Sequence, residues 1–182
     1  MAVLDQEVIL KNGERCRIFT PDETDAADLV AQMRQTSGET PFLTRYPDEV
    51  SMTAEEEASY LAKMRAAPQE LLLVARLRGA LVASAGVQCV QDRDKVRHRA
   101  VLGISVTKAC WGLGLGTALM ATLLAFAGNA GYEQVELEYV EGNDRARRLY
   151  ERLGFHLYAV RPNAFRYRDG TYAAEGLMLL RL

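Results

Sequence analysis

Metal-binding side chains are scarce in this chain of 182 residues, which has three cysteines and two histidines. Cys16, Cys89 and Cys110 are scattered and show no CxxC spacing, so they predict neither a zinc ribbon nor a disulfide framework. His98 and His156 lack the partner spacing of a metal site or of a catalytic triad. We therefore expect no metal, and the odd number of thiols favours a reducing compartment and hence a cytoplasmic location.

The chain also lacks a strong charge of either sign and a long hydrophobic run. Its 22 basic and 24 acidic side chains leave a formal net charge of −2, which provides no broad positive field for nucleic acid or for an anionic membrane. The longest apolar stretch, around residues 115–127, is too short to span a bilayer, and no basic segment followed by an apolar one opens the chain. Nucleic acid, membrane and export are therefore not expected.

Breaks in composition are absent as well. The sequence has no repeat and no low-complexity tract, and its 49% hydrophobic and 25% charged residues are ordinary values for a globular protein. The length suits one domain that buries a sizeable core. We expect residues 1–182 to form a single domain, and the sequence leaves a homodimer open because nothing in it specifies the oligomeric state.

What the chain does contain is an alternation of strand-like and helix-like patterns. Strand patterns occur at 15–20, 70–76, 80–91, 100–106, 134–140, 155–161 and 176–181. Helical patterns occur from residue 26 to a loop at 37–50, at 53–66 after the capping box Thr53-x-x-Glu56, at 114–130 and at 143–153. This order predicts an α/β fold of the α+β type, a mixed and partly antiparallel sheet of about seven strands with about four helices on its faces.

A glycine-rich turn joins the fourth predicted strand to the third predicted helix. Gly112, Gly114 and Gly116 alternate there, so no Cβ blocks the backbone N–H groups, and the helix adds its positive dipole end. A dinucleotide fingerprint would need a third glycine where Thr117 or Leu119 stands, and no Gly-Lys-Ser/Thr triplet of a Walker loop occurs in the chain. The turn predicts a site for a phosphate or pyrophosphate of another kind.

The spacing that remains is x-x-x-Gly114-x-Gly116, and a second motif follows one helix and one strand later. It comprises Leu137-Glu-Tyr-Val-Glu-Gly-Asn143, Ala146, Leu149-Tyr150 and Gly154-Phe155. The two resemble the Gln/Arg-x-x-Gly-x-Gly/Ala loop and the later Leu-x-x-x-x-x-Asn…Ala…Leu-Tyr…Gly-Phe signature of the GCN5-related N-acetyltransferase (GNAT) family. The motifs cover about residues 101–155, and the predicted element order agrees with the family's layout from end to end.

The resemblance implies acetyl-CoA as co-substrate, with its pyrophosphate on the glycine loop and its pantetheine arm along the strand before it. The cofactor-binding residues so implied are Ile104, Ser105, Val106, Trp111, Gly112, Leu113, Gly114, Leu115, Gly116, Thr117 and Asn143. Asn143 is explained equally well as the N-cap of the last helix. Trp111 departs from the family's Gln or Arg, and packing beside the loop explains it more simply than a cofactor contact.

Two residues are implied in catalysis. Tyr150 matches the family tyrosine that is proposed to protonate the departing thiolate, although a buried aromatic is the ordinary reason for a tyrosine on the apolar side of a helix. An amine with a pKa near 10 must lose a proton before it attacks, and Glu138 is the candidate base, with Glu136 in reserve. Glu138 is explained equally well as a solvated strand carboxylate, because many relatives use other bases or a water chain to accept the proton.

The acceptor pocket is expected between the loop that follows the first helix and the last hairpin. Its candidate lining residues are Phe42, Leu43, Tyr46, Phe165 and Tyr167, with Arg45 or Arg166 for a carboxylate. The expected activity is transfer of an acetyl group from acetyl-CoA to a primary amine, with a small molecule such as an amino acid as acceptor. A protein N-terminal or lysine acetyltransferase and a noncatalytic acyl-CoA-binding regulatory domain are the alternatives.

Four arginines lie on the last predicted helix, and either a solvated helix face or a contact with the 3′-phosphate of CoA explains them. They are Arg145, Arg147, Arg148 and Arg152.

Overall fold

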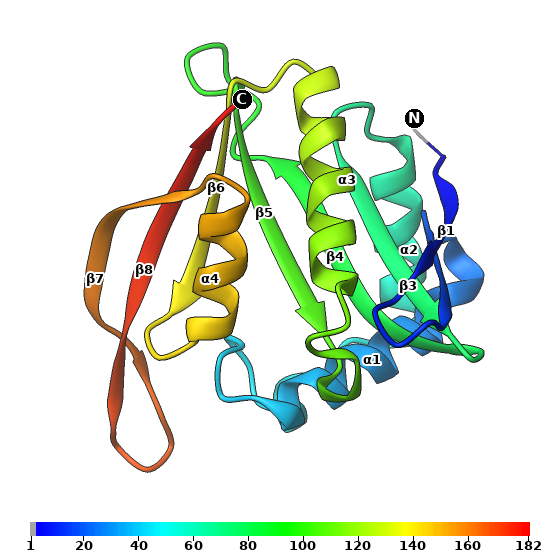
Figure 1. Ribbon diagram of the computed structural model, residues 1–182, viewed down its shortest axis with the longest axis horizontal. Coiled ribbons are helices and arrows are strands. Elements are labelled where there is room, and N and C mark those ends of the chain that lie inside the picture. Colours follow the sequence, from blue (N-terminus) through cyan, green and yellow to red (C-terminus); the bar gives the residue numbers. More distant parts are fainter. Residues whose placement is uncertain (1–2) are drawn as a thin grey trace.

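The computed structural model describes residues 3–182 and consists of one eight-stranded sheet with helices on both faces (Figure 1). The strand order is β1-β2-β3-β4-β5-β6-β8-β7. The strands are β1 (Asp5–Ile9), β2 (Arg15–Phe19), β3 (Leu71–Leu77), β4 (Ala80–Cys89), β5 (Arg99–Val106), β6 (Gln134–Val140), β7 (His156–Arg166) and β8 (Tyr172–Arg181). The α-helices are α1 (Ala26–Glu39), α2 (Ala54–Ala66), α3 (Leu115–Asn129) and α4 (Asp144–Arg152).

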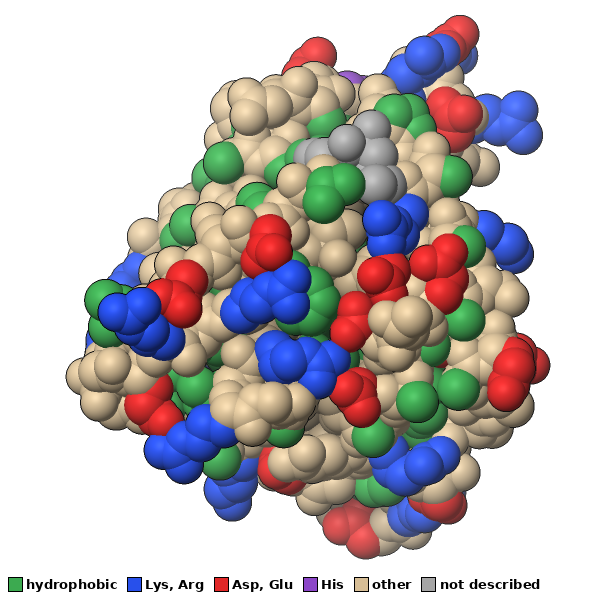
Figure 2. Space-filling view, turned by 90° about the vertical axis from the view of Figure 1, so that its right-hand side faces the viewer, with side chains coloured by type: hydrophobic (Ala, Val, Ile, Leu, Met, Phe, Trp, Pro, Cys, Tyr) green, Lys and Arg blue, Asp and Glu red, His purple; other side chains and the backbone are tan. Residues whose placement is uncertain are grey.

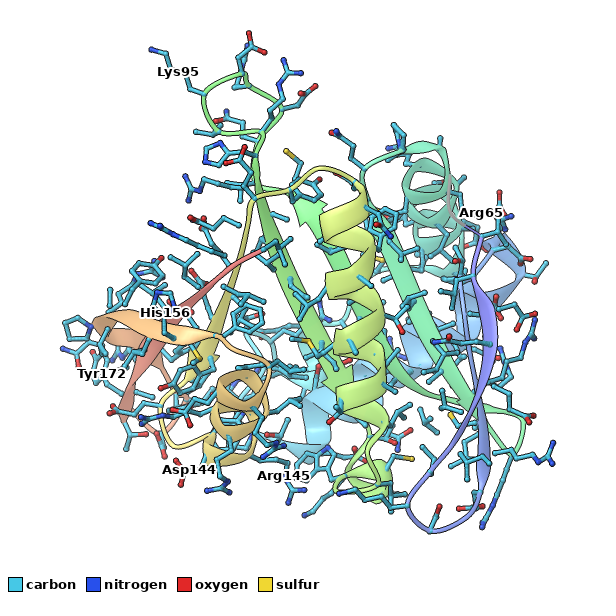
Figure 3. All side chains as sticks on the ribbon, turned by 45° about the horizontal axis from the view of Figure 1, so that its top comes forward. Arg65, Lys95, Asp144, Arg145, His156 and Tyr172 are labelled. Atoms are coloured by element: carbon cyan, nitrogen blue, oxygen red, sulfur yellow. The ribbon has the colours of Figure 1, made fainter. Side chains whose placement is uncertain are left out.

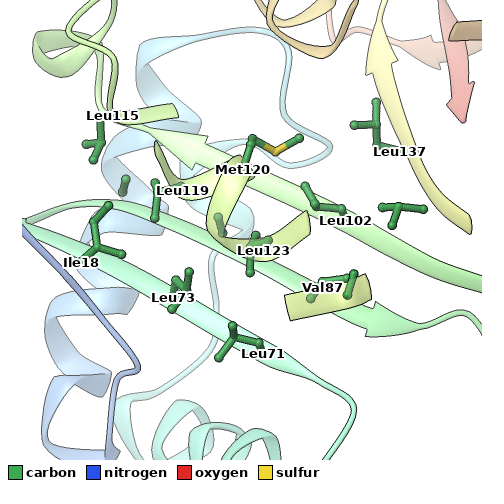
Figure 4. Close-up of a cluster of buried hydrophobic side chains, with 14 of the residues drawn as sticks. Ile18, Leu71, Leu73, Val87, Leu102, Leu115, Leu119, Met120, Leu123 and Leu137 are labelled. Atoms are coloured by element: carbon green, nitrogen blue, oxygen red, sulfur yellow. The ribbon is translucent and has the colours of Figure 1, made fainter. Parts of the chain in front are cut away.

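The helices form two layers because side chains of each strand alternate between the faces of the sheet. In β3, Leu73 belongs to the core cluster under α3, whereas its neighbour Val74 belongs to the cluster under α1 and α2. Helix α3 places Leu115, Leu119 and Leu123 in the first cluster, where all three are completely buried (Figure 4). Burial of such a side chain contributes about 1.5–3 kcal/mol. The apolar stripe of α3 therefore fixes this helix, and the loop before it, on the sheet.

The predicted α+β fold with a mixed sheet is confirmed, and the predicted strand number of about seven is one fewer than the eight observed. The additional strand is β1, which pairs with β2 in an antiparallel hairpin that turns at Asn12-Gly13, where Gly13 has a φ of +85°. Helix α1 also extends to Glu39, three residues into the predicted loop, and β7 and β8 are longer than predicted. The capping box before α2 is present, with Thr53 Oγ1 accepting from the Glu56 N–H at 3.2 Å.

Charged side chains cover the outer edge of the sheet at β1 and β2. Arg15 pairs with Glu7 at 2.9 Å and Arg17 pairs with Asp5 at 2.8 Å. Blue and red side chains accordingly lie next to one another on this side of the molecule (Figure 2). Charges on an edge strand oppose its pairing with another chain.

The sheet opens in its middle, between β5 and β6. These strands are parallel and pair only at their first residues, from Arg99 opposite Gln134 to Val101 opposite Glu136. Beyond that point β5 continues to Val106 beside β4, whereas β6 continues to Val140 beside β8. The two strands separate toward their carboxyl ends (Figure 1). The later part of β5 therefore presents to the gap a backbone edge that has no strand partner among residues 3–182.

Within residues 3–182, every helix is too short or too polar to cross a bilayer.

Candidate active site

The glycine loop lies at the carboxyl end of β5 and leads into α3. Gly112 and Gly114 have φ values of +79° and +90°, a conformation that residues with a Cβ rarely adopt. Gly114 is the N-cap of α3, and its C=O accepts the first helical hydrogen bond, from Ala118. The N–H groups of residues 112–117 have no acceptor in the described part of the chain. Six consecutive donors, three of them in the first turn of α3, thus form a cradle suited to an anion.

Trp111 packs back against the strand that precedes the loop. Its indole N–H donates to the Val106 C=O at 2.7 Å, and its ring lies 4.9 Å from the guanidinium carbon of Arg145. These contacts agree with the packing interpretation. Trp111 also occupies one lone pair of Val106, a residue whose backbone was expected to hold the pantetheine arm.

The side chains of Ser105 and Ile104, the other two strand residues expected at the cofactor, make different contacts. Ser105 Oγ lies 3.0 Å from Ser84 Oγ and accepts from the buried Gln32 amide at 3.1 Å. Ile104 packs against the core beside Gly116, with its Cδ1 3.8 Å from the position of a Cβ on that glycine. Both side chains hold β5 in place and leave the backbone edge facing the gap.

Asn143 caps α4, as one of the two interpretations predicted. Its Oδ1 accepts from the Ala146 N–H at 3.2 Å. Its side-chain amide nitrogen makes no hydrogen bond to residues 3–182, so the second interpretation, a contact with the cofactor arm, remains compatible with the geometry. The cap itself fixes the start of α4 beside the end of β6.

Tyr150 lies on the inner face of α4, with only 7% of its surface exposed and its ring 6.1 Å from that of Phe155. Its hydroxyl has no partner among the described residues, whereas every fully buried side-chain nitrogen or oxygen there has one. The hydroxyl oxygen is therefore not completely enclosed. Burial raises the pKa of Tyr150 to about 12, so the group is a protonated donor at neutral pH.

The two candidate bases on β6 differ in availability. Arg99 binds Glu136 through two hydrogen bonds, at 2.5 and 2.8 Å, which lower the pKa of that carboxyl and make it a poor proton acceptor. Glu138 is half exposed, and its only ion pair in the described chain is a loose one of 3.7 Å to Arg161. Glu138 is therefore the freer of the two carboxylates.

Glu175 on β8 is a carboxylate that the sequence analysis did not identify. It is 5% exposed, it is bound by Arg161, and its pKa is raised, first by burial and then by the neighbouring Glu138, with Arg161 acting in the opposite direction. It is the only charged residue between Tyr172 and Leu180, and that isolated charge in an apolar strand is the signal that could have found it. Glu138, Arg161 and Glu175 thus form one cluster across three strands.

The two predicted catalytic residues approach β6 from opposite faces. Tyr150 belongs to the core cluster on the α3 and α4 side, together with Leu137. Glu138 follows Leu137 in the strand and points to the other face. The gap between β5 and β6 joins these two faces, and the glycine loop lies at its end.

An open cleft of about 390 Å³ lies between the α1–α2 loop and the β7–β8 hairpin. Of the expected acceptor residues it is lined by Leu43, Arg45, Tyr46, Phe165, Arg166 and Tyr167. Phe42 does not line it; its ring instead lies 3.8 Å from the position of a Cβ on Gly142, at the turn before α4.

The hairpin is held against the loop by several contacts. Arg168 pairs with Asp48 at 2.8 Å and lies over the ring of Tyr46, whose hydroxyl accepts from the Arg168 N–H at 2.9 Å. Tyr167 also donates to the C=O of Pro41 at 3.3 Å. Within the described residues, neither Arg45 nor Arg166 forms an ion pair. Arg45 nevertheless acts on the buried Glu57, where burial raises the pKa of the carboxyl and Arg45 opposes that rise. Arg166 lies over the ring of Tyr172 and is the cation available for a carboxylate. The arrangement joins an anion-binding loop, the Tyr150 phenol and a cleft lined by two arginines around one gap in the sheet.

Comparison with known proteins agrees with this arrangement. A model of the acetyltransferase (GNAT) family matches residues 32–155. Mycothiol acetyltransferase from Sanguibacter keddieii is 32% identical over 165 residues, which are 89% of this chain and 50% of that protein, and the chain spans about half the length of the curated relatives it matches.

Solved structures share the fold. An acetyltransferase of the GNAT family from Streptococcus pneumoniae has a TM-score of 0.84 at 26% identity, and the match covers 100% of both chains. A Salmonella typhimurium acetyltransferase solved with its cofactor acetyl-CoA has a TM-score of 0.79 at 20% identity, over 92% of this chain and 94% of that one. The family match spans most of this chain, including both motifs and the gap between β5 and β6, and on that basis the chain belongs to the acetyltransferase (GNAT) family.

Proposed function

We propose that this protein transfers the acetyl group of acetyl-CoA to the primary amine of a small molecule. Acetyl-CoA is the co-substrate of this family. The observation that carries the proposal is the gap between β5 and β6, which has six free N–H donors at its end and the Tyr150 hydroxyl beside it. A long thioester with a diphosphate fits this arrangement, because the loop can hold the anion while the strand edge offers hydrogen bonds to the amides of the arm.

The chain's own residues supply the proton transfers. Glu138 takes a proton from the ammonium group, directly or through water, and the free amine then attacks the thioester carbonyl. As the C–N bond forms and the C–S bond breaks, Tyr150 donates its proton to the sulfur that leaves. The attacking nitrogen loses its second proton as the amide forms, and that proton restores Tyr150 through water. Each proton transfer by a positioned side chain typically contributes 10² to 10⁴ in rate, and alignment of the two substrates contributes several kcal/mol more.

The acceptor class follows from the cleft and from the relatives. A space of about 390 Å³ is within the range of sites for small ligands. Arg166 lines it without a carboxylate partner in the described chain, which favours an amine that also carries an acidic group. One curated relative is named for mycothiol, a small molecule, which supports the same choice.

The test is release of the CoA thiol from acetyl-CoA, measured with and without a panel of free amino acids, polyamines, aminoglycosides and short N-terminal peptides. Release that depends on an amino acid or another small amine with an acidic group supports the proposal. Release with peptides alone identifies a protein N-terminal acetyltransferase instead. CoA binding without amine-dependent release across the panel points to a noncatalytic acyl-CoA-binding domain and contradicts the transferase.

A further inference from the structure

Two cationic side chains from outside the glycine loop lie against it, one at each of its strained glycines. Arg145 belongs to the first turn of α4, where Figure 3 shows it on the side of α4 that faces the start of α3. Lys11 belongs to the turn between β1 and β2, more than 100 positions away in the sequence. Neither residue lies in the glycine motif.

Trp111 holds Arg145 in position. The indole is fixed by its hydrogen bond to the Val106 C=O, and the guanidinium carbon of Arg145 lies 4.9 Å from the centre of the ring. The negative face of the indole attracts the guanidinium and holds it over the ring. This contact brings Arg145 Nη1 to 3.9 Å from the position of a Cβ on Gly112. A guanidinium therefore lies next to the loop although Trp111 itself replaces the Gln or Arg expected at this position.

Lys11 approaches from the opposite side of the loop. Its backbone N–H donates to the C=O of Leu113 at 3.0 Å, which ties the β1–β2 turn to the loop. The Cγ and Cε atoms of its side chain lie 3.8 and 3.9 Å from the position of a Cβ on Gly114. The stem of Lys11 thus runs along Gly114, the N-cap of α3, and its ammonium group is within reach of the loop.

Neither cation is neutralised within residues 3–182. Nearby arginines, in contrast, are neutralised. Arg147 pairs with Glu151 at 2.8 Å, and Arg78 pairs with Glu14 at the β1–β2 turn. An unpaired cation beside six free N–H donors and a helix N-terminus adds to the same positive potential. The region is therefore built for an anion that carries more than one charge.

We propose that Lys11 and Arg145 bind the diphosphate of acetyl-CoA from the two sides of the glycine loop, with Trp111 as the positioning residue for Arg145. The inference rests on the proposed function, because the ligand is the co-substrate named there. The two cations match the two negative charges of the diphosphate. Trp111 acts through Arg145 and makes no contact with the phosphates.

The experiment is calorimetric titration of the wild-type chain and of Lys11→Met, Arg145→Met, Trp111→Leu and the Trp111→Leu/Arg145→Met pair with CoA and with 3′-dephospho-CoA. The matched control is Arg148→Met, which removes the same charge from the same helix. Because an exposed charged hydrogen bond is lost in each case, Lys11→Met and Arg145→Met are expected to raise Kd roughly tenfold for both ligands. Trp111→Leu should weaken binding about two- to fivefold, the range that an exposed cation–π contact supplies, and the pair should be no weaker than Arg145→Met alone.

Each other outcome overturns the inference. A loss seen with CoA and absent with 3′-dephospho-CoA would assign the cations to the 3′-phosphate. An equal loss in Arg148→Met would show a diffuse field in place of local contacts, and full additivity in the Trp111/Arg145 pair would remove the positioning role. If the wild-type chain binds neither ligand, the result contradicts the proposed function itself, and the inference falls with it. Circular dichroism of each variant confirms folding, and Lys11→Arg should restore most of the affinity.

Discussion

Tyr150 combines a buried ring with a hydroxyl that has no partner in the described chain. Because burial raises its pKa to about 12, it stays protonated throughout the range in which most enzymes work. Replacement of Tyr150 by Phe keeps the ring and its contact with Phe155 and removes only the hydroxyl group. We expect kcat to fall by roughly 10² to 10⁴, with the Kd for CoA and the melting temperature unchanged.

The pH profile checks the same assignment. A group with a pKa of about 12 keeps its proton below pH 10. Tyr150 should therefore cause no decline of the wild-type kcat between pH 7 and 9. A kcat equal to the wild-type value in the variant, or an alkaline decline near pH 8 that the variant loses, would contradict Tyr150 as the proton donor.

Residues whose role depends on local sequence could be predicted, and residues whose role depends on tertiary contact could not. Asn143 lies one position before a helix, and a short polar side chain there predicts its cap. Lys11 and Glu175 gain their importance from segments far away in the sequence, the glycine loop for the first and Arg161 for the second. The charge pattern shows that such residues exist and leaves their partners unknown.

At the scale of an element, the glycine loop and the helix after it make opposite demands on glycine. Gly114 has a φ of +90°, so Gly114→Ala forces a Cβ into a left-handed conformation and should cost about 1–2 kcal/mol of unfolding free energy. Gly128 lies within α3 with open space around its Cβ position, and Gly128→Ala should stabilise by about 0.5–1 kcal/mol. Urea denaturation measures the change in the free energy of unfolding for both variants.

The affinity for CoA distinguishes the effect of the substitution in the loop from that of the substitution in the helix. Gly114→Ala should also weaken CoA binding, because the strain shifts the N–H groups of the cradle, whereas Gly128→Ala should leave Kd unchanged. A stabilised Gly114→Ala variant, or one that binds CoA as tightly as the wild-type chain, would show that the left-handed turn is not required.

The elements themselves follow from their patterns wherever a strand or helix buries one face. Strand β1 was missed because its five residues alternate between exposed and half-buried positions and include two acids, which resembles a solvated segment. It pairs only with β2 and covers no large part of the core. The Asn12-Gly13 turn was the available signal, since that dipeptide is typical of a hairpin.

At the scale of the whole molecule, the gap in the sheet follows from a register that local patterns do not encode. Both β5 and β6 read as ordinary strands, yet they pair over three residues only and then separate. The sheet therefore consists of two parts, β1 to β5 with α3 and β6 to β8 with α4, joined by a short parallel contact.

A ligand that binds across this gap contacts both parts and should stabilise the native chain as a whole. At a CoA concentration of 100 times Kd, linkage gives about 2.7 kcal/mol. For a chain of this length 1 kcal/mol corresponds to roughly 2–4 °C, so a thermal scan should show a rise in Tm of roughly 5–11 °C. Pantetheine, which has the arm without the phosphates, should give a much smaller rise at the same concentration, because it leaves the N–H cradle and its two cations unused. An equal rise with pantetheine would place most of the binding free energy on the strand edge and would contradict the importance assigned to the loop.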